Sequence, residues 1–158
     1  MSNIVDGAHP SGADVQPRGE SMVLRPTAIV PFDRGSGIVT LPFVGKWNCE
    51  TNRLTTGYTI FEPGTAIPLH SHNVEETVLV VEGEAQAVIG DERFDLVAGE
   101  ATWVPAGIPH CFINRGAGRM SIYWAYGGRD VTRTITATGV TVEHLSEQDR
   151  GGTAAPGR

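Results

Sequence analysis

The chain has 158 residues, the length of one ordinary domain and enough to bury a hydrophobic core. The chain contains 16 valines, 10 isoleucines and 15 threonines but only 7 leucines, a composition that excludes a helical bundle and favours strands. Its 20 glycines and 10 prolines indicate that these strands are short and joined by tight turns. No apolar run approaches the roughly 20 residues that span a bilayer, and a net charge of -6 without a basic cluster argues against nucleic acid as a partner.

Taken in chain order, the sequence predicts one β-domain between two flexible ends. Residues 1–20 lack apolar periodicity and are rich in turn-forming residues, so we expect a flexible N-terminal arm, and we expect a flexible tail over 146–158 for the same reason. Between them, residues 21–145 form the predicted domain. The strand-like segments are 22–30, 54–61, 76–82, 85–89, 93–97, 111–114, 120–126 and 132–136. Gly90 and Asp91 suit a hairpin turn, and the spacing of these segments predicts an all-β sandwich or barrel.

The cysteines indicate the compartment. Cys49 and Cys111 stand 62 positions apart and form no CxxC pair, so we expect reduced thiols in a cytoplasmic protein. The first residues are polar, with no charged segment followed by an apolar one, and we therefore expect no signal peptide.

Two short segments carry the candidate chemistry. His70 and His72 are two residues apart, so in a strand both side chains point to one face, and the same alternation continued across a turn places Glu76 on that face and Glu75 on the other. His110 follows a Pro-Ala-Gly turn further along the chain. Imidazoles and a carboxylate delivered to one interior can hold a divalent metal.

The spacing of these residues resembles that of a known family. Gly64, His70, His72, Glu76 and Gly83 stand at every fixed position of the first cupin motif. The second motif is matched equally well by Gly99, Pro105, Gly107, His110 and Asn114. The 15 residues between the motifs are similar to the short intermotif segments of bacterial cupins.

This resemblance implies a single-domain cupin jelly-roll β-barrel of two antiparallel sheets. It also implies that His70, His72, Glu76 and His110 ligate one divalent transition metal ion, with Fe(II), Mn, Ni, Co, Zn and Cu all open as its identity. An isolated His-x-His pair is more often solvated or hydrogen-bonded than metal-binding, but the complete second motif makes that interpretation a minor one.

Other residues near the motifs have less certain roles. Glu75 could ligate in place of Glu76, although alternation and motif spacing both favour Glu76. We expect Glu75 or a tyrosine to transfer protons, and Tyr58 is the candidate tyrosine. Arg53 and Arg119 are both open as binders of a substrate carboxylate, and His9 and His144 are interpreted as surface histidines.

Three functions remain open. The first is a metal-dependent enzyme, chiefly a dioxygenase, acting on a small oxygenated organic substrate. The second is a non-redox isomerase, epimerase or lyase of a sugar acid or keto acid, in which the metal holds an enediolate. The third is a non-catalytic cupin that binds a small ligand, which the lack of a helix-turn-helix in this sequence disfavours. Fold alone does not choose among them.

Two further expectations concern assembly and pH. We expect a homodimer, because the segments 22–30 and 132–136 flank the barrel and offer strand edges that need covering. Metal-derived stability should fall as the pH drops below about 6.5, where protons compete for the imidazoles, and the metal-free protein should lack most of this dependence.

Overall fold

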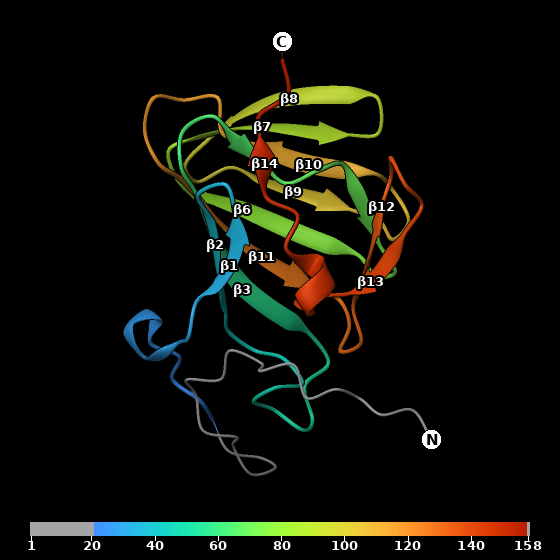
Figure 1. The fold of residues 1–158 in the computed structure, drawn as a ribbon. Helices are drawn as coiled ribbons and strands as arrows, with labels where there is room; N and C mark the ends of the chain where they lie inside the picture. The colour runs from blue at the N-terminus through green and yellow to red at the C-terminus, as the bar shows by residue number, and fades with distance from the viewer. Residues whose placement is uncertain (1–20, 158) are drawn as a thin grey trace.

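The computed structural model describes residues 21–157, and these fold into two antiparallel sheets. Figure 1 shows the strands wrapped around a common interior. The first sheet has the order β1 (Phe32–Gly35), β2 (Ile38–Pro42), β3 (Thr55–Phe61), β11 (Met120–Tyr126), β6 (Glu76–Glu82) and β9 (Ala101–Val104).

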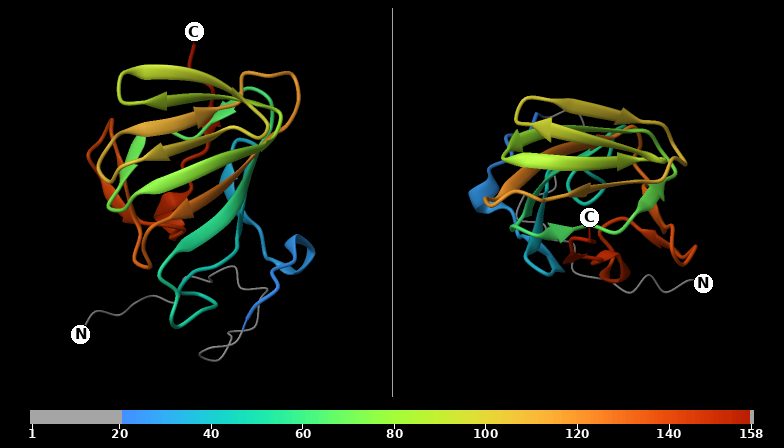
Figure 2. Two further views of the ribbon diagram at one scale, coloured as in Figure 1. Left: turned by 180° about the vertical axis from the view of Figure 1, so that it is seen from behind. Right: turned by 90° about the horizontal axis from the view of Figure 1, so that it is seen from above.

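The second sheet faces the first, as the two views in Figure 2 show. Its main order is β13 (Thr141–Glu143), β12 (Thr132–Ile135), β5 (His70–His72), β10 (His110–Ile113), β4 (Thr65–Ala66) and β14 (Thr153–Ala154). A hairpin of β7 (Glu84–Ile89) and β8 (Glu92–Val97) joins it through β10. The predicted all-β jelly-roll β-barrel is thereby confirmed.

Alternation along the strands builds the core. In β6 the side chains of Glu76, Val78 and Val80 are buried while Thr77 and Leu79 are exposed, so Glu76 faces inward as the alternation predicted. The buried valines pack with aromatic residues of β11, chiefly Trp124 and Tyr126. One face of β6 therefore carries both the apolar core and a carboxylate into the barrel.

Most of the predicted strands lie where expected, but the segment 22–30 is not a strand. It holds a 3-10 turn, η1 (Pro26–Ala28), with Pro26 at its start, where the fixed φ of proline suits a turn. The first strand, β1, begins only at Phe32. The other proposed edge, β12, is paired on both sides, by β5 and β13. Neither segment therefore supplies the free edge from which a homodimer was inferred.

The C-terminal segment 146–157 is built into the barrel, unlike the flexible tail expected there. A 3-10 turn, η2 (Glu147–Asp149), buries Asp149, and β14 pairs with β4. In Figure 1 this red segment passes from the helical turn η2, which lies next to β13, to β14. Its packing follows from ionic contacts of Asp149 with Arg133 and with Arg34, which lies 115 positions earlier, and a local composition argument does not detect them. The expected N-terminal arm, 1–20, lies outside the described residues.

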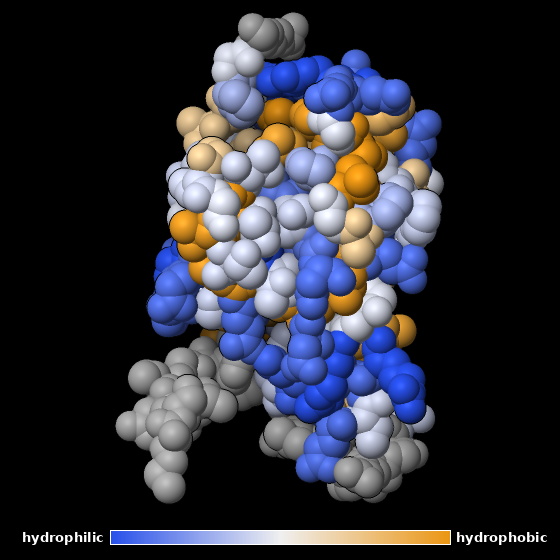
Figure 3. All heavy atoms as spheres, turned by 90° about the vertical axis from the view of Figure 1, so that its right-hand side faces the viewer, coloured by the Kyte–Doolittle hydropathy of each residue, from blue (hydrophilic) through white to orange (hydrophobic). Residues whose placement is uncertain are grey.

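The surface beside β12 and β13 is mixed in character. Figure 3 shows hydrophilic residues over the lower part and along the top of this face, with hydrophobic residues between them. Within residues 21–157 no helix has the length and apolar character needed to cross a membrane.

Candidate metal centre

Three buried histidines meet inside the barrel. His70 and His72 come from β5, and His110 from the neighbouring β10, where it is the cross-strand partner of His70. One ring nitrogen from each lies within 4.8 Å of the others. Each side chain is almost completely buried. Two adjacent strands therefore deliver three imidazoles to one point, as their spacing in the sequence predicted.

Main-chain carbonyl groups fix the orientation of all three rings. His70 Nδ1 lies 2.7 Å from the carbonyl oxygen of Pro68, His72 Nδ1 2.9 Å from that of Thr132, and His110 Nδ1 2.8 Å from that of Ile108. Because a carbonyl oxygen only accepts, we assign the ring proton to Nδ1 in each case. This leaves the Nε2 lone pairs for a ligand, the arrangement that metal-binding histidines favour.

Glu76 approaches the same point from the opposite sheet. Its Oε2 lies 2.5 Å from His110 Nε2. With Nδ1 of His110 donating to Ile108, both of these atoms present lone pairs, and such atoms come this close only when a proton or a cation lies between them. His72 Nε2 is also buried without a hydrogen-bond partner. The four donors therefore suit a divalent transition metal, for which imidazole and carboxylate are ordinary ligands.

Burial and charge favour the metal-binding form of His70, His72 and Glu76, whereas the contact with Glu76 favours the protonated form of His110. Burial lowers the pKa of His72 to about 3, opposed by the charge of Glu76 and reinforced by that of Arg133. Burial and Arg133 also lower the pKa of His70 well below its ordinary value. For Glu76, burial alone would raise the pKa, but the hydrogen bond and charge of His110 outweigh it and the pKa falls. The same contact raises the pKa of His110 despite its burial.

Two of the four side chains, His70 and Glu76, line a cavity of about 20 Å³. That space holds an ion or a water molecule and little more. Its wall is mostly apolar and includes Phe112, two residues after His110 on β10. The lining comprises Arg34, Thr59, Phe61, Ile67, His70, Glu76, Phe112, Ile122, Trp124, Tyr126 and Arg133. Burial raises the pKa of Tyr126 well above its ordinary value, so its hydroxyl stays protonated.

A buried ionic cluster adjoins this cavity. Asp149 lies between two arginines, with Oδ2 3.4 Å from Arg34 Nη1 and Oδ1 3.2 Å from Arg133 Nη1. His144 Nδ1 is 3.4 Å from Asp149 Oδ2. Burial lowers the pKa of His144 to about 4, although Asp149 opposes the shift, so this ring is neutral at physiological pH.

This cluster is the part of the site that the sequence did not predict. His144 is buried, and its interpretation as a surface residue was wrong; His9 lies outside the described residues. The two arginines considered as carboxylate binders are elsewhere: Arg53 is exposed and Arg119 pairs with Glu62 on the surface. The arginines of the cavity are instead Arg34 and Arg133.

The two residues expected to transfer protons lie apart from the four donors. Glu75 is exposed and accepts a hydrogen bond from Trp103 Nε1 at 3.0 Å. Tyr58 stacks on Phe43, at 6.4 Å between ring centroids, and is not among the cavity residues. The tyrosine that lines the cavity is Tyr126. A catalytic role for Glu75 or Tyr58 stays a prediction.

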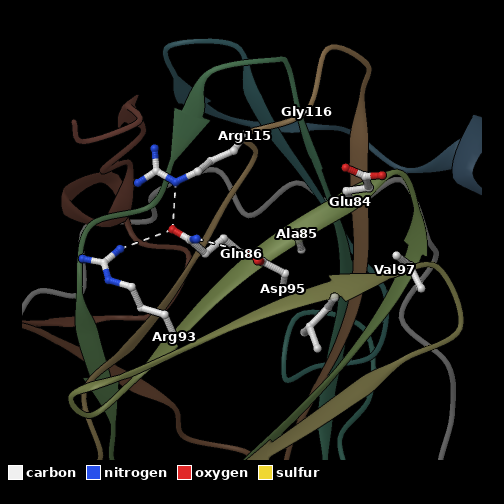
Figure 4. Close-up of a pocket in the computed structure, with 9 residues that line it drawn as sticks. Glu84, Ala85, Gln86, Arg93, Asp95, Val97, Arg115 and Gly116 are labelled. Carbon is white, nitrogen blue, oxygen red and sulfur yellow. Dashed lines mark hydrogen bonds between the residues drawn. The ribbon is translucent and has the colours of Figure 1, made fainter. Parts of the chain in front are cut away.

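A larger groove of about 620 Å³ lies on the outside of the β7–β8 hairpin. Figure 4 shows Arg93 and Arg115 converging there on Gln86, whose Oε1 accepts hydrogen bonds from both. None of the histidines of the metal centre lines it. Its carboxylates, Glu84 and Asp95, belong to no group of converging metal ligands among the described residues, so we assign the chemistry to the smaller interior cavity.

Comparisons with known proteins agree with this fold. The model of the Cupin domain family matches residues 57–126, a span that contains all four donors. The chain is 31% identical over 108 residues to Endoribonuclease YbeY of Myxococcus xanthus, covering 68% of this chain and 36% of that protein. It is 33% identical over 96 residues to the HTH-type transcriptional regulator PuuR of Escherichia coli, covering 60% and 51%. With Quercetin 2,3-dioxygenase of Bacillus subtilis it shares 38% identity over 50 residues, covering 31% and 15%.

The chain thus spans about half or less of these curated relatives. Among solved structures, an RmlC-like cupin from Shewanella frigidimarina is 20% identical with a TM-score of 0.54, covering 62% of this chain and 82% of that one. The oxalate decarboxylase OxdC of Bacillus subtilis is 18% identical with a TM-score of 0.56, covering 70% and 29%. The family match identifies a Cupin domain at residues 57–126, and the described part of the chain shares the fold of these solved cupin structures.

Proposed function

We propose that this protein is a metal-dependent enzyme acting on a small oxygenated organic substrate, with a dioxygenase as the favoured reaction class. His70, His72, Glu76 and His110 would hold one divalent transition metal ion. This proposal depends chiefly on one contact, in which Glu76 Oε2 lies 2.5 Å from His110 Nε2. The imidazoles of His70 and His72 lie beside this pair, and carbonyl oxygens hold their Nδ1 atoms. Such a four-donor set leaves about two positions of an octahedral ion free.

The ion would supply Lewis-acid activation of a bound oxygen ligand and, as Fe(II), redox chemistry with dioxygen. The protein's own residues do the rest. The carbonyl groups of Pro68, Thr132 and Ile108 hold the rings in position, and the apolar wall at Phe112 excludes water, which strengthens every charge interaction within the cavity. Tyr126, neutral and buried, can donate a hydrogen bond to an anionic oxygen.

Similarity over 50 residues to a quercetin dioxygenase supports the oxygenase class, although that stretch is a small part of the relative. A second candidate, a ligand-binding module without turnover, is supported by the similarity to a transcriptional regulator over 96 residues. An isomerase or lyase would use the same ion without oxygen. We keep the homodimer as a proposal to be tested by light scattering, where a monomeric mass at working concentration would contradict it.

The deciding experiment combines metal analysis with oxygen uptake. Protein purified without chelator should contain about one divalent ion per chain, and the Fe(II)-loaded protein should consume oxygen with one member of a panel of catechols, enediols, 2-oxo acids and hydroxy acids. Product formed without oxygen uptake would instead establish an isomerase or lyase. Thermal stabilisation by a ligand without any product would favour the binding module.

A further inference from the structure

Arg133 occupies a special position relative to the metal centre. It lies on β12 directly across from His72 on β5, and cross-strand partners point to the same side of a sheet. Its side chain is therefore directed into the barrel, where it is only 2% exposed and lines the same cavity as His70 and Glu76. A permanent cation thus stands beside the residues that would hold another cation.

The guanidinium of Arg133 is poorly satisfied by the protein. Its Nε and Nη1 have no hydrogen-bond partner in the described part of the chain, although Nη1 is 3.2 Å from Asp149 Oδ1. Arg34 differs, since its Nε donates to Thr40 at 2.8 Å and its Nη1 donates to the carbonyl oxygen of Asp149 at 2.5 Å. Nη1 thus has a counter-charge, and Nε is the buried donor without an acceptor. Because an unpaired donor of a buried charged group is costly, we take it as a sign that a ligand supplies an acceptor there.

The charge of the site indicates the sign of that group. Arg34 and Arg133 are balanced by Asp149 and Glu76, and His144 is neutral because burial lowers its pKa to about 4. Adding a divalent ion leaves two uncompensated positive charges in a closed, water-poor interior. Such an excess is relieved most directly by an anionic ligand.

We propose that the cavity binds the anion of a small 2-oxo or 2-hydroxy acid. The carboxylate group accepts hydrogen bonds from Arg133, and the oxygen on the adjacent carbon atom faces the four donors. This inference rests on the proposed metal site and names the substrate class for it. Arginine suits this role because its planar guanidinium group can donate two parallel hydrogen bonds to one carboxylate group. The cavity of about 20 Å³ has room for an ion or a water molecule, so a bound acid requires the side chains of the wall to move apart. The smallest 2-oxo and 2-hydroxy acids require the least movement, and flat aromatic substrates the most. The bound acid would compete with the Asp149 carboxylate for the guanidinium group of Arg133.

The test is calorimetric titration of Mn²⁺-loaded protein with glycolate and with pyruvate, using glycolamide as the neutral counterpart of glycolate. At least one acid should bind to the wild type, and glycolamide should bind about tenfold more weakly than glycolate or worse. Arg133→Gln should weaken binding of the acid by about tenfold or more while its Mn²⁺ content stays unchanged. Arg133→Lys, which keeps the charge but not the fork, should lie between them. Arg119→Gln, on the surface beside Glu62, should bind as the wild type does.

The outcomes separate this inference from the metal site on which it rests. Equal acid affinity in the wild type, Arg133→Gln and Arg133→Lys, at full Mn²⁺ content, would overturn the carboxylate inference and leave the metal site intact. Equal affinity for glycolate and glycolamide, or no binding of either acid to loaded wild type, would overturn it too. A wild type that takes up no Mn²⁺, Fe²⁺ or Zn²⁺ would overturn the metal site and this inference together.

Discussion

Arg133 and His72 are direct cross-strand partners, so a guanidinium group and an imidazole share one patch of the barrel interior. Burial is the main reason that the pKa of His72 falls to about 3, and the positive charge of Arg133 adds to the effect against the opposing charge of Glu76. The neighbour therefore favours the neutral ring, which is the form with a free lone pair. One pair of strands thus supplies both a proposed metal donor and a charge that adds to the effect of burial in keeping this donor unprotonated.

Removing two donors should abolish metal binding without unfolding the barrel. We expect the double variant His70→Ala, His72→Ala to lose most of its bound metal, because two of four ligands remain, whereas the aliphatic core around Val78 and Val80 is untouched. Elemental analysis and circular dichroism measure the two effects.

His144→Gln is the matched control, since this histidine is equally buried and its ring centroid lies 6.2 Å from that of His72 without belonging to the donor group. It should keep its metal. Stoichiometric metal in the double variant would refute the assignment of the site.

The stability of the metal-free protein should fall as the pH drops. His72 and His144 have folded-state pKa values of about 3 and about 4, below the ordinary 6.5, so the unfolded chain takes up protons that the folded chain does not. Stability is then complete above about pH 6.5 and decreases by about 1.4 kcal/mol per pH unit for each such histidine toward pH 4. His110, with its raised pKa, opposes part of this trend.

The sequence alone led us to expect little pH dependence without metal, and burial of the histidines revises that expectation. Chemical denaturation of the chelator-treated protein between about pH 8 and pH 5 measures the slope, and His144→Gln should reduce it. A flat profile for the metal-free wild type would contradict the buried, neutral state of these rings. Bound metal should steepen the fall, because protons compete with it for the same nitrogens.

Deleting the C-terminal segment should destabilise the fold. A chain ending at residue 145 lacks Asp149 and leaves Arg34 and Arg133 buried without their counter-charge, for which we expect a loss of about 3–5 kcal/mol. It also lacks β14, which pairs with β4. Urea denaturation measures the change, and a chain that lacks only residues 157 and 158 should match the wild type. Unchanged stability of the longer deletion would mean that this segment is a true tail.

Two glycines of the motifs should respond differently to alanine. Gly83 and Gly107 both have left-handed backbones, with φ of +76° and +81°. A Cβ at Gly83 would lie 2.3 Å from the carbonyl oxygen of Arg119, whereas a Cβ at Gly107 would meet nothing within 4 Å. We expect Gly107→Ala to cost about 1 kcal/mol from backbone strain alone and Gly83→Ala clearly more. Equal losses in thermal denaturation would contradict the close approach at Gly83.

The sequence was informative where function depends on alternation within a strand and on turn spacing. His70, His72 and Glu76 could be assigned to one face because β5 and β6 are regular and follow each other closely. Arg133 gave no such signal, because an arginine between two threonines is typical of an exposed strand. Asp149 lies in a glycine-rich segment and meets Arg34 across 115 positions, a contact that no local pattern encodes.

Main-chain carbonyl groups orient the three imidazoles, and these groups persist when side chains are substituted. Every residue has a main-chain carbonyl, so substitutions at Pro68, Thr132 or Ile108 need not disturb the aim of the rings. Side chains of the cavity wall, such as Ile67 and Ile122, are then free to vary in size and polarity without misplacing the donors. Substitutions in the cavity wall can thus change which substrate fits while the side chains proposed to bind the metal keep their positions.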